Sequence, residues 1–345
     1  MPISLTHFAA RAGDHNDRAM VASGHLAAVL GERLSAATTV IGEPQPAEPA
    51  NWDLELDAAM PALRAMASRF ELVFGAGDVP VTALSRCAVA LATLPVVASH
   101  RPDAIVVWFD AHADLNTPEN TSSGFLGGLA LSGPLGLWNS GLGGGLAPAN
   151  AILVGTRDLD PAEQELVDDG TIRLVPGGPE MAAELQRAVA GRPVYVHIDC
   201  DVLEPGLVPT DYRVPHGMSL GQLDECAEVL AQARSSASRS ASSRHPMAMP
   251  IRSAPLARSS RRSSRSCGTS SARRSREDLQ PVAVAAVDGI VDVEAADEDG
   301  VGDPKPAALE GLEKNRANGM ISGDIASRRC WGAPRRRCPA VPEMR

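Results

Sequence analysis

The segment 106–115 constrains the fold of this chain most, because an apolar run ends there abruptly in an Asp-x-His-x-Asp motif. Such a run between turn residues predicts a strand that is buried on both faces of a parallel sheet. Alternate residues of an extended chain point the same way, so Asp110, His112 and Asp114 can converge at the carboxyl end of that strand. Two carboxylates and an imidazole suit a divalent ion such as Mn²⁺. The competing interpretation is a strand that ends in a solvated polar turn.

A second segment, 193–205, repeats this arrangement. Here an apolar strand presents His197, Asp199 and Asp201 on one face. Acidic groups at the end of a buried strand are costly unless a cation compensates them, so two such strand ends predict one shared metal site. His197 has two interpretations at this stage, as a ligand or ligand partner and as a packed core histidine.

Composition limits the class of protein. The chain has 345 residues, of which 44% are hydrophobic, enough for one large α/β domain or two smaller ones. Its net charge of −10 argues against a general binder of polyanions, so nucleic acid is not an expected partner. The six cysteines form no C-x-x-C pair, and no apolar run approaches the roughly 18 residues of a membrane span. We therefore expect a reduced, cytoplasmic protein that does not interact with membranes.

Strand and helix patterns alternate along the chain. Strands are expected at 38–42, 71–75, 106–109, 151–155, 171–175 and 193–199, and helices at 14–34, 53–70, 80–97, from about 162, and at 180–190 and 219–233. This alternation predicts an α/β fold with a parallel, doubly wound sheet.

The composition changes at Arg234. Residues 234–276 contain 15 Ser and 11 Arg in 43 residues and no acidic residue. Such a tract cannot bury enough apolar surface to offset its ordering entropy, which predicts disorder. RNA binding, a linker and a reading-frame slip are competing interpretations, of which we favour the slip. The predicted organisation is an incomplete α/β domain at 1–233, the tract, and a poorly defined C-terminal region at 277–345.

Together these motifs resemble the ureohydrolase superfamily of arginase, agmatinase and formimidoylglutamase. The matching parts are Asp-Ala-His-Ala-Asp at 110–114 and Asp-Cys-Asp at 199–201, followed by Glu-Pro at 204–205. The resemblance implies a three-layer α/β/α sandwich, disrupted here in its C-terminal part, and a manganese site of one or two ions. It further implies that Asp110 and Asp199 bridge the metals, that His112 and Asp201 complete one site, and that Asp114 is a metal-linked catalytic residue of the other.

Within this superfamily the loops are most similar to those of arginase. The matching stretches are Asp-Leu-Asn-Thr-Pro at 114–118, Thr-Ser-Ser-Gly at 121–124 and Arg-Asp-Leu-Asp-Pro-Ala-Glu at 157–163. By this resemblance Asn116 and Ser123 hold the α-carboxylate of a substrate, while Asp160 and Glu163 lie near its α-amino group. Turn formation and helix capping are the competing interpretation for these polar residues.

Three departures from the family pattern stand out. Ala-Gly-Asp-Val at 76–79 replaces Gly-Gly-Asp-His, so Val79 is expected at the position of a histidine ligand. Gly127 takes the position of a proton-shuttling histidine, and Phe125 replaces an asparagine that contacts the carboxylate. The family's downstream glutamate has no clear counterpart.

These features predict a manganese-dependent ureohydrolase in which metal-bound hydroxide attacks a guanidinium carbon and releases urea. The expected partner is a small guanidino or amidino substrate, and the resemblance leaves a homo-oligomer open. A one-metal, deacetylase-like amide hydrolase is the first alternative, and a catalytically impaired, metal-binding remnant of the family is the second.

Overall fold

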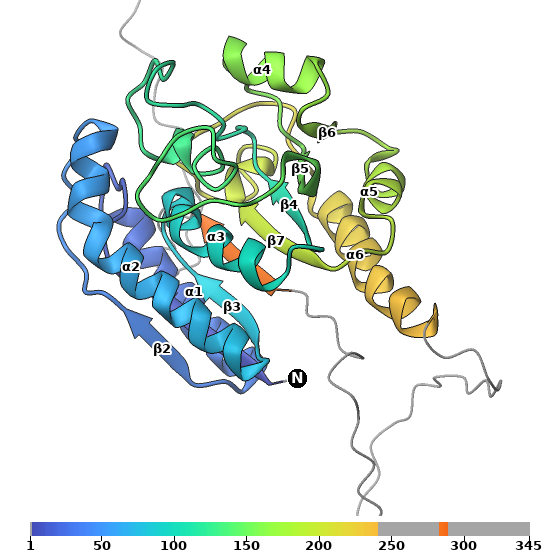
Figure 1. Ribbon diagram of the computed structural model, residues 1–345, viewed down its shortest axis with the longest axis horizontal. Coiled ribbons are helices and arrows are strands. Elements are labelled where there is room, and N and C mark those ends of the chain that lie inside the picture. The colour runs from blue at the N-terminus through green and yellow to red at the C-terminus, as the bar shows by residue number, and fades with distance from the viewer. Residues whose placement is uncertain (1, 241–282, 289–345) are drawn as a thin grey trace, which may run out of the picture. The chain divides into compact units, whose positions relative to one another are not determined.

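A computed structural model describes residues 2–240 and 283–288 of the chain, and it describes side chains through residue 231 (Figure 1). The described strands form one parallel sheet of eight strands in the order β2-β1-β3-β8-β7-β4-β5-β6. Their bounds are β1 Ile3–Phe8, β2 Thr38–Ile41, β3 Val79–Ala83, β4 Ile105–Phe109, β5 Ala151–Val154, β6 Arg173–Val175, β7 Val194–Asp199 and β8 Ala283–Asp288. The described α-helices are α1 Arg18–Leu34, α2 Trp52–Ala76, α3 Ala90–His100, α4 Pro161–Asp168, α5 Met181–Val189 and α6 Leu220–Ser240.

Each face of the sheet is covered by its own apolar core. Val106 and Trp108 of β4 belong to a core shared with α2 and α3, whereas Val107 and Phe109 belong to a core shared with α5 and α6. This alternation is the expected result for a strand buried on both sides. The predicted three-layer α/β/α sandwich with a parallel, doubly wound sheet is thereby confirmed.

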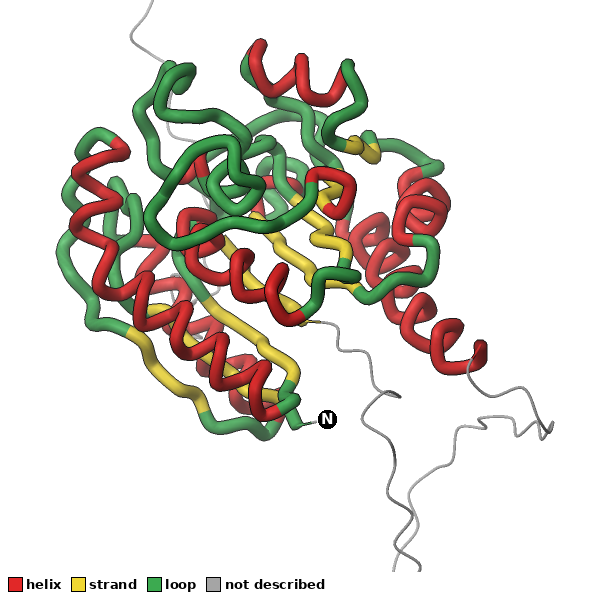
Figure 2. Tube along the Cα trace, viewed as in Figure 1, coloured by secondary structure: helices red, strands yellow, loops and turns green. Residues whose placement is uncertain are grey.

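Because all strands run in parallel, their carboxyl ends share one edge of the sheet. Long loops gather at this edge, as the green segments of the tube in Figure 2 show. In the ladder between β4 and β7, Phe109 pairs with Ile198, which brings the acidic residues that follow each strand side by side. The register therefore determines where the two predicted acidic motifs meet.

The strand predicted at 71–75 is wrong, because this segment is the last part of α2. Leu63, Met66, Phe70 and Val73 are all buried, and their spacing of three and four residues continues the helical face. Gly77, with φ 73°, ends the helix in the left-handed conformation that glycine adopts without strain. The strand in this part of the chain is instead β3, which follows α2 and lies where we expected a loop and the start of a helix. β1, at the N-terminus, was also not predicted.

The described C-terminal elements extend the α/β unit past the predicted boundary at residue 233. α6 continues to Ser240, and β8 pairs with β3 on one side and β7 on the other. β8 comes from the region that we predicted to be poorly defined, and it occupies an interior position of the sheet. Residues 241–276 of the Ser/Arg tract lie outside the described residues, so its predicted disorder and the proposed three-part division remain proposals.

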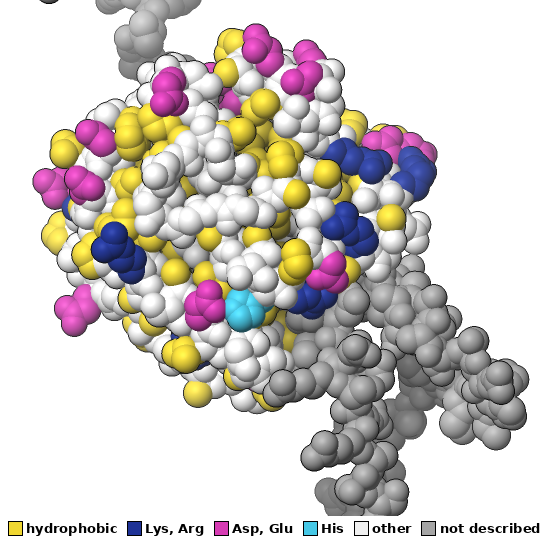
Figure 3. All heavy atoms as spheres, in the orientation of Figure 1, with side chains coloured by type: hydrophobic (Ala, Val, Ile, Leu, Met, Phe, Trp, Pro, Cys, Tyr) yellow, Lys and Arg dark blue, Asp and Glu magenta, His cyan; other side chains and the backbone are white. Residues whose placement is uncertain are grey.

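The surface of the described part has a mixed character. On the face drawn in Figure 3, acidic, basic and apolar side chains are interspersed over the helices and loops. Among the described residues, none of the helices combines the length and apolarity that crossing a membrane would require.

The interior position of β8 generates a prediction about truncation. A chain that ends after Ser240 loses β8 and leaves the facing edges of β3 and β7 without their partner. We expect this variant to lose its cooperative thermal unfolding transition, as followed by circular dichroism, because unpaired interior backbone groups are costly.

The matched control ends at Glu294, where the compact unit that contains the sheet ends. This variant keeps β8 and should unfold at nearly the temperature of the full chain. Equal unfolding temperatures for the two truncations would show that β8 does not support the sheet.

Candidate active site

The two acidic strand ends meet in one cavity at the carboxyl edge of the sheet. Asp110 follows β4 directly, and Asp199 is the last residue of β7. Asp201 follows in the 3₁₀ helix η4 (Cys200–Val202), where its backbone N–H donates to Asp199 Oδ1 at 2.8 Å. Asp201 Oδ1 accepts from the backbone N–H of Ala111 at 3.1 Å, which ties the two strand ends together.

His112 lies between the carboxylates of both strand ends. Its Nδ1 is 3.3 Å from Asp110 Oδ1 and 3.1 Å from Asp201 Oδ2. These three residues present ligand atoms that all lie within 4.8 Å of one another, a spacing suited to one metal ion. The predicted convergence of Asp110, His112 and Asp201 is thus present in the fold.

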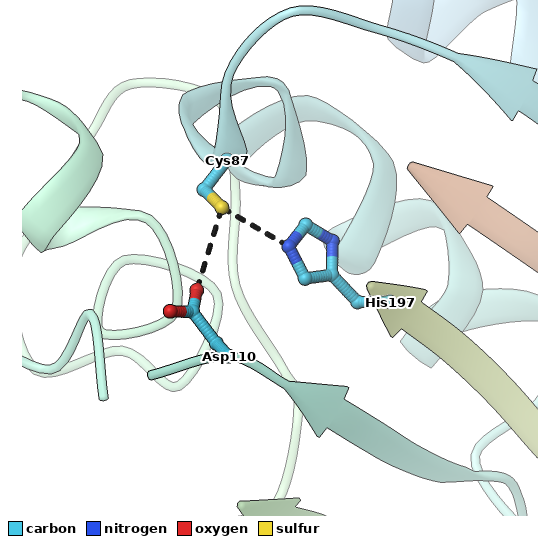
Figure 4. Close-up of side chains that lie close together, drawn as sticks. All are labelled: Cys87, Asp110 and His197. Carbon is cyan, nitrogen blue, oxygen red and sulfur yellow. Dashed lines mark hydrogen bonds between the residues drawn. The ribbon is translucent and has the colours of Figure 1, made fainter. Parts of the chain in front are cut away.

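Cys87 joins the cluster from a third strand. It begins the 3₁₀ helix η1 (Cys87–Val89), which follows the carboxyl end of β3. Its Sγ lies 3.6 Å from Asp110 Oδ2, 3.5 Å from Asp199 Oδ2 and 3.1 Å from His197 Nε2. Cys87, Asp110 and His197 form a second group of residues with metal-ligand spacing, drawn in Figure 4.

The expectation that Val79 takes the position of a metal ligand is wrong for a geometric reason. Val79 is the first residue of β3 and pairs with Ile3 of β1, so it lies at the amino end of the strand, opposite to the cavity. Cys87 follows the other end of the same strand. The sequence signal for Cys87 was its place after an apolar strand, and it was missed because β3 was placed several residues too early.

His197 is buried in β7 and packs face to face on Trp108, with ring centroids 3.5 Å apart. Burial lowers its pKa to about 3, so the ring is neutral and one of its nitrogens can accept a hydrogen bond. Its Nε2 faces the thiol of Cys87. His197 is therefore a packed core residue that also contacts the cluster at Cys87.

The cluster concentrates negative charge in a buried position. Burial, and then the carboxylate of Asp201, raise the pKa of Asp110 to about 6. Burial, and then the carboxylate of Asp110, also raise the pKa of Asp114 well above its usual value. Burial alone would lower the pKa of His112, but its hydrogen bonds to Asp110 and Asp201 raise it to about 12. This environment favours any added positive charge.

Asp114 turns toward the same cavity. Its backbone is left-handed, with φ 54°, a conformation that aspartate tolerates better than most residues, and its carbonyl accepts from the backbone N–H groups of Leu131 and Ser132. Non-glycine residues in this conformation cluster at functional sites. The turn at Asp114 separates the metal-ligand end of the cavity from the polar end that follows.

The polar end contains all four predicted substrate residues. Asn116 Nδ2 donates to Asp160 Oδ2 at 2.8 Å, while the buried Oδ1 of Asn116 has no hydrogen-bond partner in the described structure. Ser123 is exposed, and its Oγ accepts from the backbone N–H of Phe125 at 3.2 Å. The side-chain oxygens of Glu163 accept from the backbone N–H groups of Leu115 and Asp160, both at 2.8 Å. These two bonds connect the start of α4 to the loop at Leu115.

Gly127 also lines the cavity. A Cβ added at this glycine would lie 2.5 Å from Cε1 of Phe125, so the phenylalanine ring occupies the space of a side chain at position 127. A side chain at position 127 would therefore require Phe125 to move.

The cavity has a volume of about 260 Å³. It is lined by every predicted metal and substrate residue, namely Asp110, His112, Asp114, Asn116, Ser123, Asp160, Glu163, Asp199 and Asp201. Sequence reasoning missed Cys87, Arg86, Asp211 and Tyr212, which also line it. The last two lie in a loop with no apolar periodicity and carried no signal of their own.

The donor set fits a divalent metal ion. Carboxylate oxygens and an imidazole nitrogen are the ligands that Mn²⁺ and similar ions take in proteins. A thiolate at Cys87 would favour softer metal ions. The raised pKa values of Asp110 and Asp114 show the electrostatic cost that a cation would relieve.

A parallel three-layer α/β/α sandwich with an acidic cavity at its carboxyl edge defines the class of this protein. Comparison with known proteins identifies the family. A profile of the arginase family matches residues 48–238, more than half of the chain. The chain therefore belongs to the arginase family, which is metal-dependent.

Relatives of known activity differ in how much of their length the chain spans. An N(omega)-hydroxy-L-arginine amidinohydrolase of Streptomyces lavendulae is 43% identical over 208 residues, which are 60% of this chain and 76% of that protein. An arginase of Eremothecium gossypii is 35% identical over 166 residues, which are 42% of this chain and only 41% of that protein. The solved arginase of Bacillus caldovelox superposes with a TM-score of 0.56 at 26% identity, covering 68% of this chain and 87% of that one.

The charge of the cluster predicts how metal binding depends on pH. Because the pKa of Asp110 is raised to about 6, this group holds a proton in the metal-free fold at lower pH, and an ion must displace that proton. The rise in unfolding temperature caused by Mn²⁺ should therefore be larger at about pH 7.5 than at about pH 5.

Differential scanning calorimetry of the chelator-treated and Mn²⁺-loaded protein measures this difference. Asp110→Asn is the matched control and should show no large Mn²⁺-dependent rise at either pH. An equal rise at both pH values in the unmutated protein would contradict the assignment of the carboxylates as ligands.

Proposed function

We propose that this protein is a metal-dependent amidine hydrolase that acts on a free amino acid with a guanidino head group. The observation that carries the proposal is one cavity with two chemically distinct ends, a carboxylate-rich end at the strand termini and a polar end at Asn116 and Asp160. The names of the similar proteins, an N(omega)-hydroxy-L-arginine amidinohydrolase and arginases, support an amidine as the substrate.

We propose that Cys87, Asp110 and Asp199 would hold one ion, to which Asp114 would contribute, and that Asp110, His112, Asp199 and Asp201 would hold the other. Mn²⁺ is the proposed metal, since most of these ligand atoms are oxygens. A divalent ion here supplies Lewis acidity and lowers the pKa of a water so that it can act as a nucleophile at neutral pH.

The polar end supports recognition of an α-amino acid. The unpartnered, buried Oδ1 of Asn116 can accept a hydrogen bond from an α-ammonium, and the carboxylate of Asp160 lies beside it. The hydroxyl of Ser123 keeps its own hydrogen for the α-carboxylate, because its oxygen is the acceptor in the bond from Phe125. We therefore assign Asn116 to the ammonium side, which differs from the role that the resemblance implied, and we keep Ser123 on the carboxylate side.

Hydrolysis breaks the bond between the amidine carbon and the nitrogen that carries the aliphatic chain. The amidine carbon gains the oxygen of water and leaves as urea, or as hydroxyurea when the substrate carries an N-hydroxyl group. The chain nitrogen takes up a proton and remains as an amine. Asp114 is the acidic residue placed between the two ends of the cavity, and we propose that it hydrogen-bonds the attacking water.

Mutations at the two ends of the cavity should have different effects on metal content and on kinetics. His112→Ala or Asp201→Ala should abolish metal-dependent hydrolysis and reduce metal content, because each removes one of the four proposed ligands of the same ion. Asp160→Ala or Ser123→Ala should leave metal content unchanged and raise KM roughly ten- to a hundredfold, since a lost charge-assisted hydrogen bond costs about 1.5–3 kcal/mol.

Release of urea from L-arginine, and of hydroxyurea from N-hydroxy-L-arginine, is the assay, with elemental analysis of each variant. Full-length, Mn²⁺-loaded protein that releases neither product would overturn the proposed function. Release of acetate from acetylated amines by the same preparation would then favour the deacetylase-like alternative.

A further inference from the structure

Two neighbouring aromatic rings, those of Phe125 and Tyr212, line the cavity. The ring of Tyr212 contacts His112 edge to face, with centroids 5.2 Å apart, and it also contacts Phe125 edge to face at 6.3 Å. Phe125 in turn meets the ring of His15 at 4.6 Å. Phe125 and Tyr212 both line the cavity, so a row of rings runs from the metal-ligand end, at His112, toward the polar end, where Ser123 lies.

Tyr212 is held in this position by the residue before it. Asp211 accepts hydrogen bonds from three donors on two other segments, Asn16 at 2.9 Å, Arg18 at 3.0 Å and the buried Arg86 at 2.8 Å. These bonds lower the pKa of Asp211 although its partial burial raises it, so the carboxylate stays ionised. The loop that carries Tyr212 is thus fastened to the start of α1 and to the loop after β3.

The other end of the same loop is fastened by Arg157. Its guanidinium donates to the carbonyls of Val214 at 2.8 Å and Pro215 at 3.0 Å, and also to the carbonyl of Asp201 at 2.9 Å. Tyr212 therefore lies between two points of attachment, one of which also contacts the metal-ligand segment. A ring that is fixed in this way can contact a ligand without a large loss of conformational entropy.

The rings also determine what charge the cavity accepts. The faces of aromatic rings attract cations, so Phe125 and Tyr212 favour a planar cationic group over a neutral one of the same shape. Phe125 fills the space of a side chain at Gly127, so its ring replaces any side chain there.

We propose that Phe125 and Tyr212 form an aromatic wall that determines specificity for a planar, cationic head group and its aliphatic chain. Tyr212, beside His112, covers the guanidinium, and Phe125, nearer to Ser123, covers the chain. This inference rests on the proposed function, because it names the residues by which the same cavity selects its substrate.

Binding of L-arginine and L-citrulline to the full-length, chelator-treated protein, in which metal-dependent hydrolysis cannot consume arginine, tests the wall by isothermal titration calorimetry. These two ligands have nearly the same shape, but only arginine has a charged head. Tyr212→Leu should weaken arginine binding roughly five- to thirtyfold and citrulline binding less than about twofold, the range expected for a partly desolvated cation–π contact. Tyr212→Phe, which keeps the ring, should bind both ligands nearly as the unmutated protein does.

Tyr212 is 45% exposed, so these substitutions should leave the fold intact, which circular dichroism verifies. Equal losses for arginine and citrulline, no loss for either, or no binding of arginine by the unmutated protein would overturn the wall. Selective loss of arginine binding in a protein without hydrolytic activity would support the wall and overturn the proposed function. If the protein hydrolyses a guanidino acid and Tyr212→Leu does not change this activity, the proposed function would be supported and the wall would be overturned.

Discussion

Mutual repulsion among buried carboxylates is the constraint on which this structure depends. Asp110, Asp114, Asp199 and Asp201 are each at most 8% exposed and share one cavity. Grouping like charges in a low-dielectric position is costly unless a cation compensates them. The parallel sheet places these residues together because its register brings the ends of β4 and β7 side by side. The fold therefore creates an electrostatic cost that a metal ion is suited to remove.

The sequence predicted those parts of the site that follow from local periodicity. The strands that end at Asp110 and Asp199 are continuous apolar runs, and a strand with alternate acidic residues beyond its end has few other interpretations. Substrate residues such as Asn116 and Asp160 were found because the loop motifs resemble those of a family. The fold and the family are confirmed, and the individual roles of Asn116 and Asp160 are proposals.

Other parts could not be predicted because the deciding contacts are distant in the sequence. The helical face of α2 continues through Val73, but the run from Glu71 to Gly75 is equally apolar when read as a strand. That error displaced β3 and hid Cys87, whose importance depends on packing against Asp110 and His197. β8 was missed because its short apolar run follows a long Ser/Arg-rich tract, and only its pairing with the distant strands β3 and β7 places it in the sheet.

Loop residues complete the cavity above the sheet edge. Asp211 and Arg157 fasten a loop whose Tyr212 reaches the ligand end of the site, and Phe125 takes the space beside Gly127. A rigid sheet edge can thus keep its acidic cluster while loop residues change the selection of substrate. On this account the metal-ligand end determines the chemistry and the aromatic wall determines which head group enters.

Metal content tests the central claim most directly. After Mn²⁺ loading and gel filtration of the full-length protein, inductively coupled plasma mass spectrometry should find close to two ions per chain, because Cys87 adds to the carboxylates and His112. Cys87→Ala should reduce this content toward one ion. Retention of a single ion by the unmutated protein would contradict the role of Cys87, and retention of none would contradict the assignment of the carboxylate cluster as a metal centre.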